Sequence, residues 1–97
     1  MARFHVSPAA QRDIAEITEF IMRDNPVRAL SFAHELRVKI AKAAQTPLAY
    51  RERTEIRPGI RAARHGKYLI FFRYDGAAVE VLRVWHSARD YGDVFQD

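Results

Sequence analysis

The chain has 97 residues with a net charge of +4, from 16 lysines and arginines against 12 aspartates and glutamates, and it has no cysteine. This length predicts one domain, residues 1–97, with a single core and no cleft between domains. The missing thiols exclude disulfides and thiolate metal sites, and no apolar run nears the roughly 20 residues that span a bilayer. We therefore expect a cytoplasmic protein without a signal peptide or membrane contact.

The first predicted elements are a short strand and a helix. Residues 3–6 alternate polar and apolar side chains, as strands do. Ser7 and Pro8 then start a helix, because serine caps free N–H groups and proline fits the first turn. Apolar side chains follow at helical spacing on one face: Ala10, Ile14, Ile17 and Ile21. The opposite face is polar and carries Arg12, Glu16, Glu19 and Arg23.

A second helix is predicted directly after the first. Asn25 and Pro26 repeat the same start chemistry, and Thr46-Pro47 ends the helix. Its apolar face has the same periodicity. The members of this face are Ala29, Phe32, Ala33, Leu36, Ile40 and Ala43. The tight junction between the two helices predicts an antiparallel helix hairpin.

The second half of the chain predicts three strands. After a loop over residues 47–59, residues 60–64 form a short strand. Asp75-Gly76, between apolar runs at residues 67–74 and 77–85, predicts a hairpin with a two-residue turn. In the last strand, alternate side chains are expected to face opposite sides. Val79, Val81, Arg83 and Trp85 are expected on one side, and Glu80, Leu82, Val84 and His86 on the other.

The element order β-α-α-β-β-β predicts an α+β fold. In this fold the N-terminal helix hairpin packs on one face of a small, mostly antiparallel sheet. The second sheet face is then left uncovered. Residues 51–89 carry nine basic and four acidic side chains, a net charge of +5. This excess suits a polyanion or an acidic protein partner, although ordinary solubilising charge is a competing explanation.

Eight segments, in order along nearly the whole chain, resemble toxins of the RelE/ParE superfamily of bacterial toxin–antitoxin systems, and most closely its ParE branch. They are residues 7–10, 13–17, 25–26, 29–32, 47, 58–61, 68–73 and 82–90. The resemblance implies the fold described above and a small acidic ParD-like antitoxin that wraps the toxin in a hetero-oligomer. DNA would be contacted only through that antitoxin. ParE-type members target DNA gyrase, whereas RelE-type members cut messenger RNA on the ribosome.

Cleavage of RNA without a metal needs a base, an acid and cations for the phosphate. The residues that could supply them are His86, Arg61, Arg83, Arg89 and Tyr91. RelE-type nucleases concentrate lysines and arginines around the middle loop, but here that loop contains Glu52 and Glu55 and no lysine. We therefore predict no catalytic residues and inhibition of gyrase by direct binding. The alternatives are a RelE-type endonuclease and an inactive member that only binds its antitoxin.

The predicted partner-binding residues lie in the three C-terminal strands. They are Arg61, Arg64, Arg73, Arg83, Trp85 and His86. For the two arginines of the hairpin, at positions 73 and 83, the alternative is an ion pair with Glu80 or Asp90. For the tryptophan it is a place in the core, and for the histidine a hydrogen bond to the backbone or to Asp90.

Two further expectations concern charge and metal binding. Arg89 and Asp90 are predicted to form an ion pair that fixes the C-terminal turn. The remaining histidines, His5, His34 and His65, lie in separate elements without ligand spacing. We therefore expect neither a metal site nor a cofactor.

Overall fold

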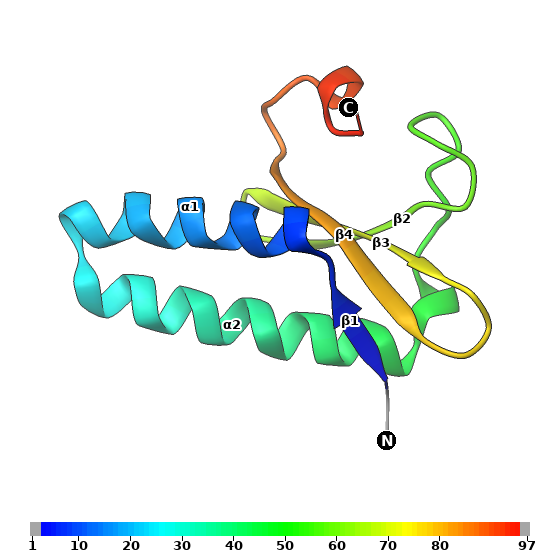
Figure 1. The fold of residues 1–97 in the computed structure, drawn as a ribbon, viewed down its shortest axis with the longest axis horizontal. Helices are drawn as coiled ribbons and strands as arrows, with labels where there is room; N and C mark the ends of the chain where they lie inside the picture. The colour runs from blue at the N-terminus through cyan, green and yellow to red at the C-terminus, as the bar shows by residue number, and fades with distance from the viewer. Residues whose placement is uncertain (1–2, 96–97) are drawn as a thin grey trace.

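Two helices lie on one face of a four-stranded sheet in the computed structural model, which describes residues 3–95 (Figure 1). The elements are β1 (Phe4–Val6), α1 (Pro8–Asp24), α2 (Pro26–Gln45), β2 (Arg61–His65), β3 (Tyr68–Tyr74) and β4 (Val79–His86), with short 3-10 turns at Pro47–Ala49 and Tyr91–Asp93. The strand order is β1-β4-β3-β2, with β1 parallel to β4 and the other pairs antiparallel. The predicted α+β fold is confirmed.

Both helices start as their sequences predict. The Ser7 hydroxyl accepts a hydrogen bond from the Ala10 N–H (3.1 Å), and the Asn25 side chain accepts one from the Arg28 N–H (3.0 Å). The Ser7 hydroxyl also donates to the Leu82 carbonyl (3.0 Å), which ties the start of α1 to β4. None of the helices among residues 3–95 is long and apolar enough to cross a membrane.

The first core lies between the helices and the sheet. The predicted apolar faces of α1 and α2 meet there, and Leu36 is only 1% exposed. Its sheet side is formed by Ala63, Ile70, Phe72, Val79, Val81 and Val84. Burial of each large aliphatic side chain contributes roughly 1.5–3 kcal/mol, so this layer holds the helix hairpin on the sheet.

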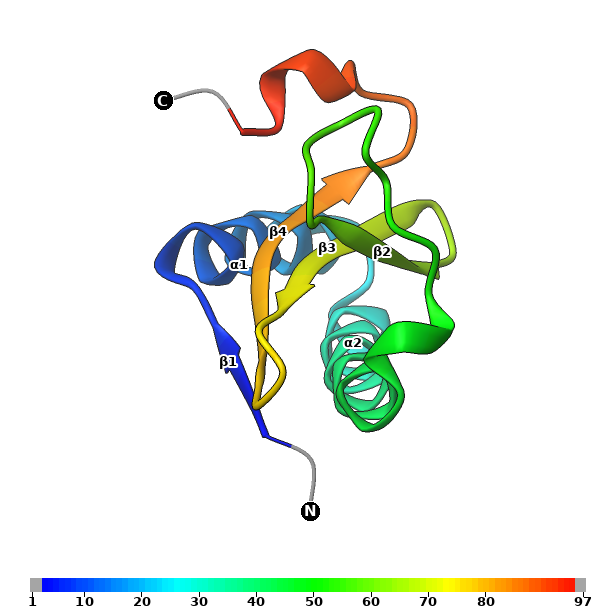
Figure 2. The same ribbon diagram turned by 90° about the vertical axis from the view of Figure 1, so that its right-hand side faces the viewer.

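The second sheet face is covered, contrary to the expectation that it is left over. Ile60, Leu69, Phe71, Trp85 and Val94 form a second core on that face. Figure 2 shows the loop before β2 (green) and the C-terminal segment (orange to red) on this side of the sheet, with α2 on the opposite side. The covering side chains have no strand or helix period, so periodicity could not reveal them.

The β3–β4 hairpin differs from the prediction in its turn. Tyr74 pairs with Val79, so four residues connect the strands instead of two. The Asp75 carboxylate accepts hydrogen bonds from the N–H groups of Ala77 (2.8 Å) and Ala78 (2.9 Å). These bonds stabilise a longer loop, in which Gly76 takes a positive φ of 95°.

A β-bulge in β4 overturns the predicted alternation of side chains. Phe71 pairs with Arg83 and Phe72 with Val81, which leaves Leu82 as the extra residue. An extra residue shifts the faces of the residues beyond it by one position. Val84 therefore joins Val81 in the first core, whereas Leu82 packs with Trp85 in the second core.

Candidate partner-binding surfaces

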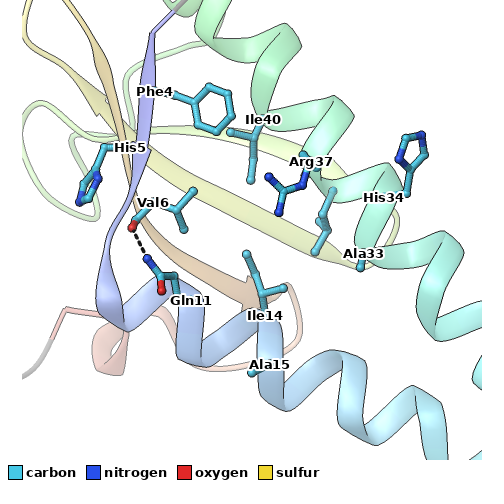
Figure 3. Close-up of a pocket in the computed structure, with 11 residues that line it drawn as sticks. Phe4, His5, Val6, Gln11, Ile14, Ala15, Ala33, His34, Arg37 and Ile40 are labelled. Atoms are coloured by element: carbon cyan, nitrogen blue, oxygen red, sulfur yellow. Dashed lines mark hydrogen bonds between the residues drawn. The ribbon is translucent and has the colours of Figure 1, made fainter.

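An open groove runs between α1, α2 and β1 and has a volume of about 710 Å³. Figure 3 shows Phe4, Ile14 and Ile40 around this space, from three different elements. Leu36 also lines it, so the groove reaches down to the first core. Its polar lining residues are His5, Gln11, His34 and Arg37. An apolar floor bordered by one arginine and two histidines suits an amphipathic segment that carries acidic side chains.

The groove is bordered by a strand edge. Val79 N–H bonds to the Arg3 carbonyl (3.1 Å), and Ser7 N–H bonds to the Val81 carbonyl (2.9 Å). Because alternate residues of a strand bond to the same neighbour, the backbone groups of Phe4 and Val6 face away from β4. Gln11 donates to the Val6 carbonyl (2.9 Å; Figure 3). The remaining outward groups of β1 are available to an added strand.

Arg83 is held by three hydrogen bonds to two distant parts of the chain. Its guanidinium donates to both carboxylate oxygens of Asp13 on α1, from Nε (2.7 Å) and Nη2 (2.9 Å), and to the Val94 carbonyl from Nη1 (2.8 Å). The Asp13 carboxylate raises the pKa of Arg83, while partial burial acts in the opposite direction. Arg83 therefore pairs with neither Glu80 nor Asp90, contrary to the expected alternative.

Asp13 is a residue whose role the sequence did not reveal. It is only 8% exposed, and its Oδ2 also accepts the backbone N–H of Val84 (3.0 Å). The Asp13 carboxylate takes the place of a neighbouring strand at Val84, because β1 pairs with β4 only over Val79 to Val81. The only signal in the sequence is its position directly beside the apolar stripe of α1, one residue before Ile14.

The other predicted partner residues are scattered over the sheet. Arg61 donates to the Tyr50 carbonyl (2.6 Å), and Arg64 is exposed on β2. Arg73 pairs with Glu80 (2.8 Å), which is the alternative that the sequence offered. Trp85 is 2% exposed and occupies the second core. The partner roles of these residues stay predictions, but they do not form one surface.

Two predictions about the end of β4 have different outcomes. His86 Nδ1 accepts the N–H of Ala88 (3.0 Å), which confirms a backbone bond for this histidine. The predicted Arg89–Asp90 ion pair is wrong. The Arg89 guanidinium lies 3.6 Å from the centre of the Trp85 ring, and Asp90 caps the following 3-10 turn by accepting the Gly92 N–H (2.8 Å). Stacking on an indole ring is favourable for a guanidinium, here on an exposed side chain.

One residue of the nuclease alternative, Arg61, lies apart from His86. Arg61 lies opposite Phe72 and His86 opposite Tyr68, at different ends of the sheet. At roughly 3.3 Å per residue, the four-residue step from Tyr68 to Phe72 on β3 separates their positions along the strands by about 13 Å. Tyr91 packs on the second core, and its hydroxyl donates to the Ser87 carbonyl (3.2 Å). His86 and Arg89 line one cleft.

The groove residues were also missed as a site, because exposed His34 and Arg37 on α2 are indistinguishable in sequence from a solvated helix face.

In the described part of the chain, no group of three or more His, Cys, Asp or Glu side chains is arranged to hold a metal ion.

The fold and groove were compared with known proteins. Residues 4–91 match the family model described as the ParE toxin of the type II toxin–antitoxin system parDE. The chain belongs to the ParE toxin family. Toxin ParE1 of Mycobacterium tuberculosis, in strains CDC 1551 and H37Rv, is 35% identical over 91 residues, which cover 92% of this chain and 93% of the relative.

Solved structures share the ParE-type fold. A chain from the chromosomal ParDE system of P. aeruginosa superimposes with a TM-score of 0.75 and 19% identity, covering 89% of this chain and 96% of that one. A chain of the RelBE2 toxin–antitoxin complex of Mycobacterium tuberculosis has a TM-score of 0.55 and 22% identity, covering 88% and 96%. At these identities, the likeness concerns the fold.

Proposed function

We propose that this toxin inhibits DNA gyrase in the cytoplasm by direct binding and is neutralised by a small acidic ParD-like antitoxin. Membership of the ParE family supports this target class. The observation that carries the proposal is the separation of Arg61 from His86 along the sheet, because acid, base and cations must meet at one phosphate to cleave RNA. Inhibition by contact requires no such convergence.

The antitoxin segment is proposed to occupy the groove between α1, α2 and β1. Two solved structures with this fold belong to ParDE and RelBE2 toxin–antitoxin systems. The exposed apolar residues Met22 (49%) and Leu30 (72%) lie on the two helices that form the groove walls. An amphipathic acidic helix can bury its apolar side there and place carboxylates beside His34 and Arg37. An extended continuation can pair with the free edge of β1.

Gyrase supercoiling and ribosome-bound messenger cleavage test the proposed activity side by side. The purified chain is expected to block supercoiling, to accumulate gyrase-cleaved DNA and to leave messenger RNA intact. Cuts in the messenger that disappear in His86→Ala, with supercoiling unaffected, favour the endonuclease alternative. That alternative is supported by His86 and Arg89, which line one cleft.

The groove is tested by Ala15→Glu. Ala15 is exposed and lines the groove, so glutamate adds both bulk and a charge that repels an acidic segment. The antitoxin concentration that restores supercoiling is expected to rise at least tenfold, while inhibition without antitoxin stays unchanged. Ala49→Glu, at an exposed position outside the groove lining, is the matched control. Equal antitoxin requirements for both variants contradict the groove assignment.

A further inference from the structure

The basic side chains of residues 51–89 divide into those with an acidic partner and those without one. Among the nine basic residues at 51–89, ion pairs are formed by Arg51, Arg53, Arg61, Arg73 and Arg83. Within residues 3–95, the others have no carboxylate within 4.0 Å: Arg57, Arg64, Lys67 and Arg89. Arg57 stacks on Phe95 (5.0 Å). The charge excess is therefore carried mainly by these four side chains, three of which are near one another: Arg64, Lys67 and Arg89.

These three side chains lie at one end of the sheet. Arg64 and Lys67 flank the β2–β3 turn, where Arg64 Nε donates to the Gly66 carbonyl (3.0 Å). The Lys67 carbonyl accepts the N–H of Ser87 (2.8 Å), so this turn touches the end of β4. Arg89 follows two residues later. We name Arg64, Lys67, His86 and Arg89 the cationic end.

The cationic end keeps hydrogen-bond donors unused. Because His86 Nδ1 accepts the Ala88 N–H, the neutral ring carries its proton on Nε2. In the described residues, neither that Nε2 nor the hydroxyl of half-buried Tyr68 has a hydrogen-bond partner. Arg89 is held in place by the Trp85 ring, so its N–H groups remain available while its plane is fixed. Preorganised donors of this kind lower the entropic cost of binding.

An exposed aromatic side chain adjoins these donors. A cleft of about 370 Å³ is lined by Phe20 and Glu16 from α1 and by Tyr68, His86 and Arg89 from the sheet side. Phe20 is 63% exposed, although it is large and apolar. Aromatic residues beside arginine are enriched at the centres of protein interfaces. No residue lines both this cleft and the groove.

We propose that the cationic end and Phe20 form a second docking surface, separate from the groove, for an acidic and partly apolar patch on the target protein. The proposal rests on the proposed function for its identification of the target as gyrase. Charge complementarity determines the chemistry of the partner, because three unpaired cations require carboxylates opposite them. Phe20 requires an apolar contact, which a phosphate backbone does not offer. A protein surface therefore fits better than DNA.

The test reverses the charge at Arg64 and Lys67 together. Both are exposed and have no acidic partner within residues 3–95, so Arg64→Glu/Lys67→Glu is expected to leave the fold and the antitoxin affinity unchanged. Gyrase inhibition is expected to weaken at least tenfold, mainly through a slower and less salt-dependent association rate. Phe20→Ser is expected to weaken inhibition through faster dissociation. Arg12→Glu/Lys42→Glu, with the same change of net charge on exposed helix positions, is the matched control.

Growth arrest on expression in bacteria gives a readout that does not depend on the target. Loss of arrest in the double variant, with arrest intact in the control, supports the docking surface. If the wild-type chain does not affect gyrase in the same experiments, the gyrase assignment is overturned and the surface still stands. Full gyrase inhibition and full arrest by the double variant overturn the surface and leave the function standing. A wild-type chain without either effect overturns both. Salt-sensitive retention of bare duplex DNA that disappears in the double variant overturns the protein-docking assignment in favour of phosphate contact.

Discussion

A single carboxylate, Glu35, connects the second helix to the sheet. It accepts hydrogen bonds from Arg28 (2.7 Å) within α2 and contacts His65 Nε2 (2.9 Å) at the end of β2. The hydrogen bond from Arg28, followed by that from His65, lowers the pKa of Glu35 below the ordinary range of glutamate. Phe32 packs against the His65 ring (5.6 Å), so the polar contact lies at the margin of the first core.

The lowered pKa of Glu35 predicts a pH-dependent contribution to stability. A carboxylate with a depressed folded-state pKa stabilises the fold above its unfolded pKa, near 4.3, and this contribution is lost as the pH falls through the folded value. Glu35→Gln is expected to be less stable than the wild type at about pH 6 and to approach it at about pH 3. Urea unfolding at both pH values measures this, with Glu19→Gln as the control. A constant difference between wild type and Glu35→Gln contradicts the assignment.

Among the elements, the two helices show why amphipathic periodicity predicts which side chains are buried and which are exposed. On α2, Leu36 faces the first core, whereas on α1 Glu19 lies on the exposed face. Each of these positions follows from a spacing of three or four residues. The stability of the hairpin therefore depends on one face of each helix.

Truncation on these two faces should have unequal effects. Leu36→Ala leaves a cavity in a closely packed core and is expected to cost about 2–5 kcal/mol of the free energy of unfolding. Glu19→Ala removes an exposed side chain and is expected to cost less than about 0.5 kcal/mol. The shift of the urea midpoint measures both. Equal shifts mean that the helix register is wrong.

The elements that were predicted well from the sequence are those with a period or a capping residue. The helix starts at Ser7 and Asn25 and the three C-terminal strands follow local rules of capping and turn chemistry. The bulge at Leu82 could not be predicted, because an extra residue changes no local preference and is defined only by the partner strand. The role of Asp13 depends on the missing neighbour of β4, which is a property of the assembled sheet.

The site was predicted less well than the fold for the same reason. Trp85 and the basic residues were visible as residue types, but whether each one is paired, buried or exposed depends on segments far away in the chain. Arg83 and Arg89 both lie against the Trp85 ring (4.9 and 3.6 Å), yet only Arg83 has a carboxylate partner. Sequence alone cannot distinguish them.

At the scale of the whole molecule, the Asp13–Arg83 pair connects the two cores. Asp13 lies on α1 above the first core, and the same arginine holds the carbonyl of Val94, whose side chain belongs to the second core. The side chains are 10% and 23% exposed, so water screens the pair only partly. Removal of one member of a buried pair leaves the other charge without compensation.

Asp13→Ala is therefore expected to lower the free energy of unfolding by about 3 kcal/mol, the low end of the range for buried pairs, because Arg83 keeps some access to water. It also leaves the Val84 N–H without its acceptor. Chemical denaturation followed by Trp85 fluorescence measures the change. Glu16→Ala, on the exposed side of the same helix, serves as the reference and should cost well under 1 kcal/mol. A similar loss in both variants contradicts a connecting role for Asp13.

The parallel pairing of β1 with β4 also has a consequence for the order of events during translation. Ser7 and Leu82 are joined by a hydrogen bond across 75 positions, and the last partner of Arg83 is the carbonyl of Val94. Contacts between such distant segments form late. Until β4 has emerged from the ribosome, the strand that walls the groove has no neighbour to bind. Folding of this toxin is therefore completed only after the segment from β4 to Val94 has left the ribosome.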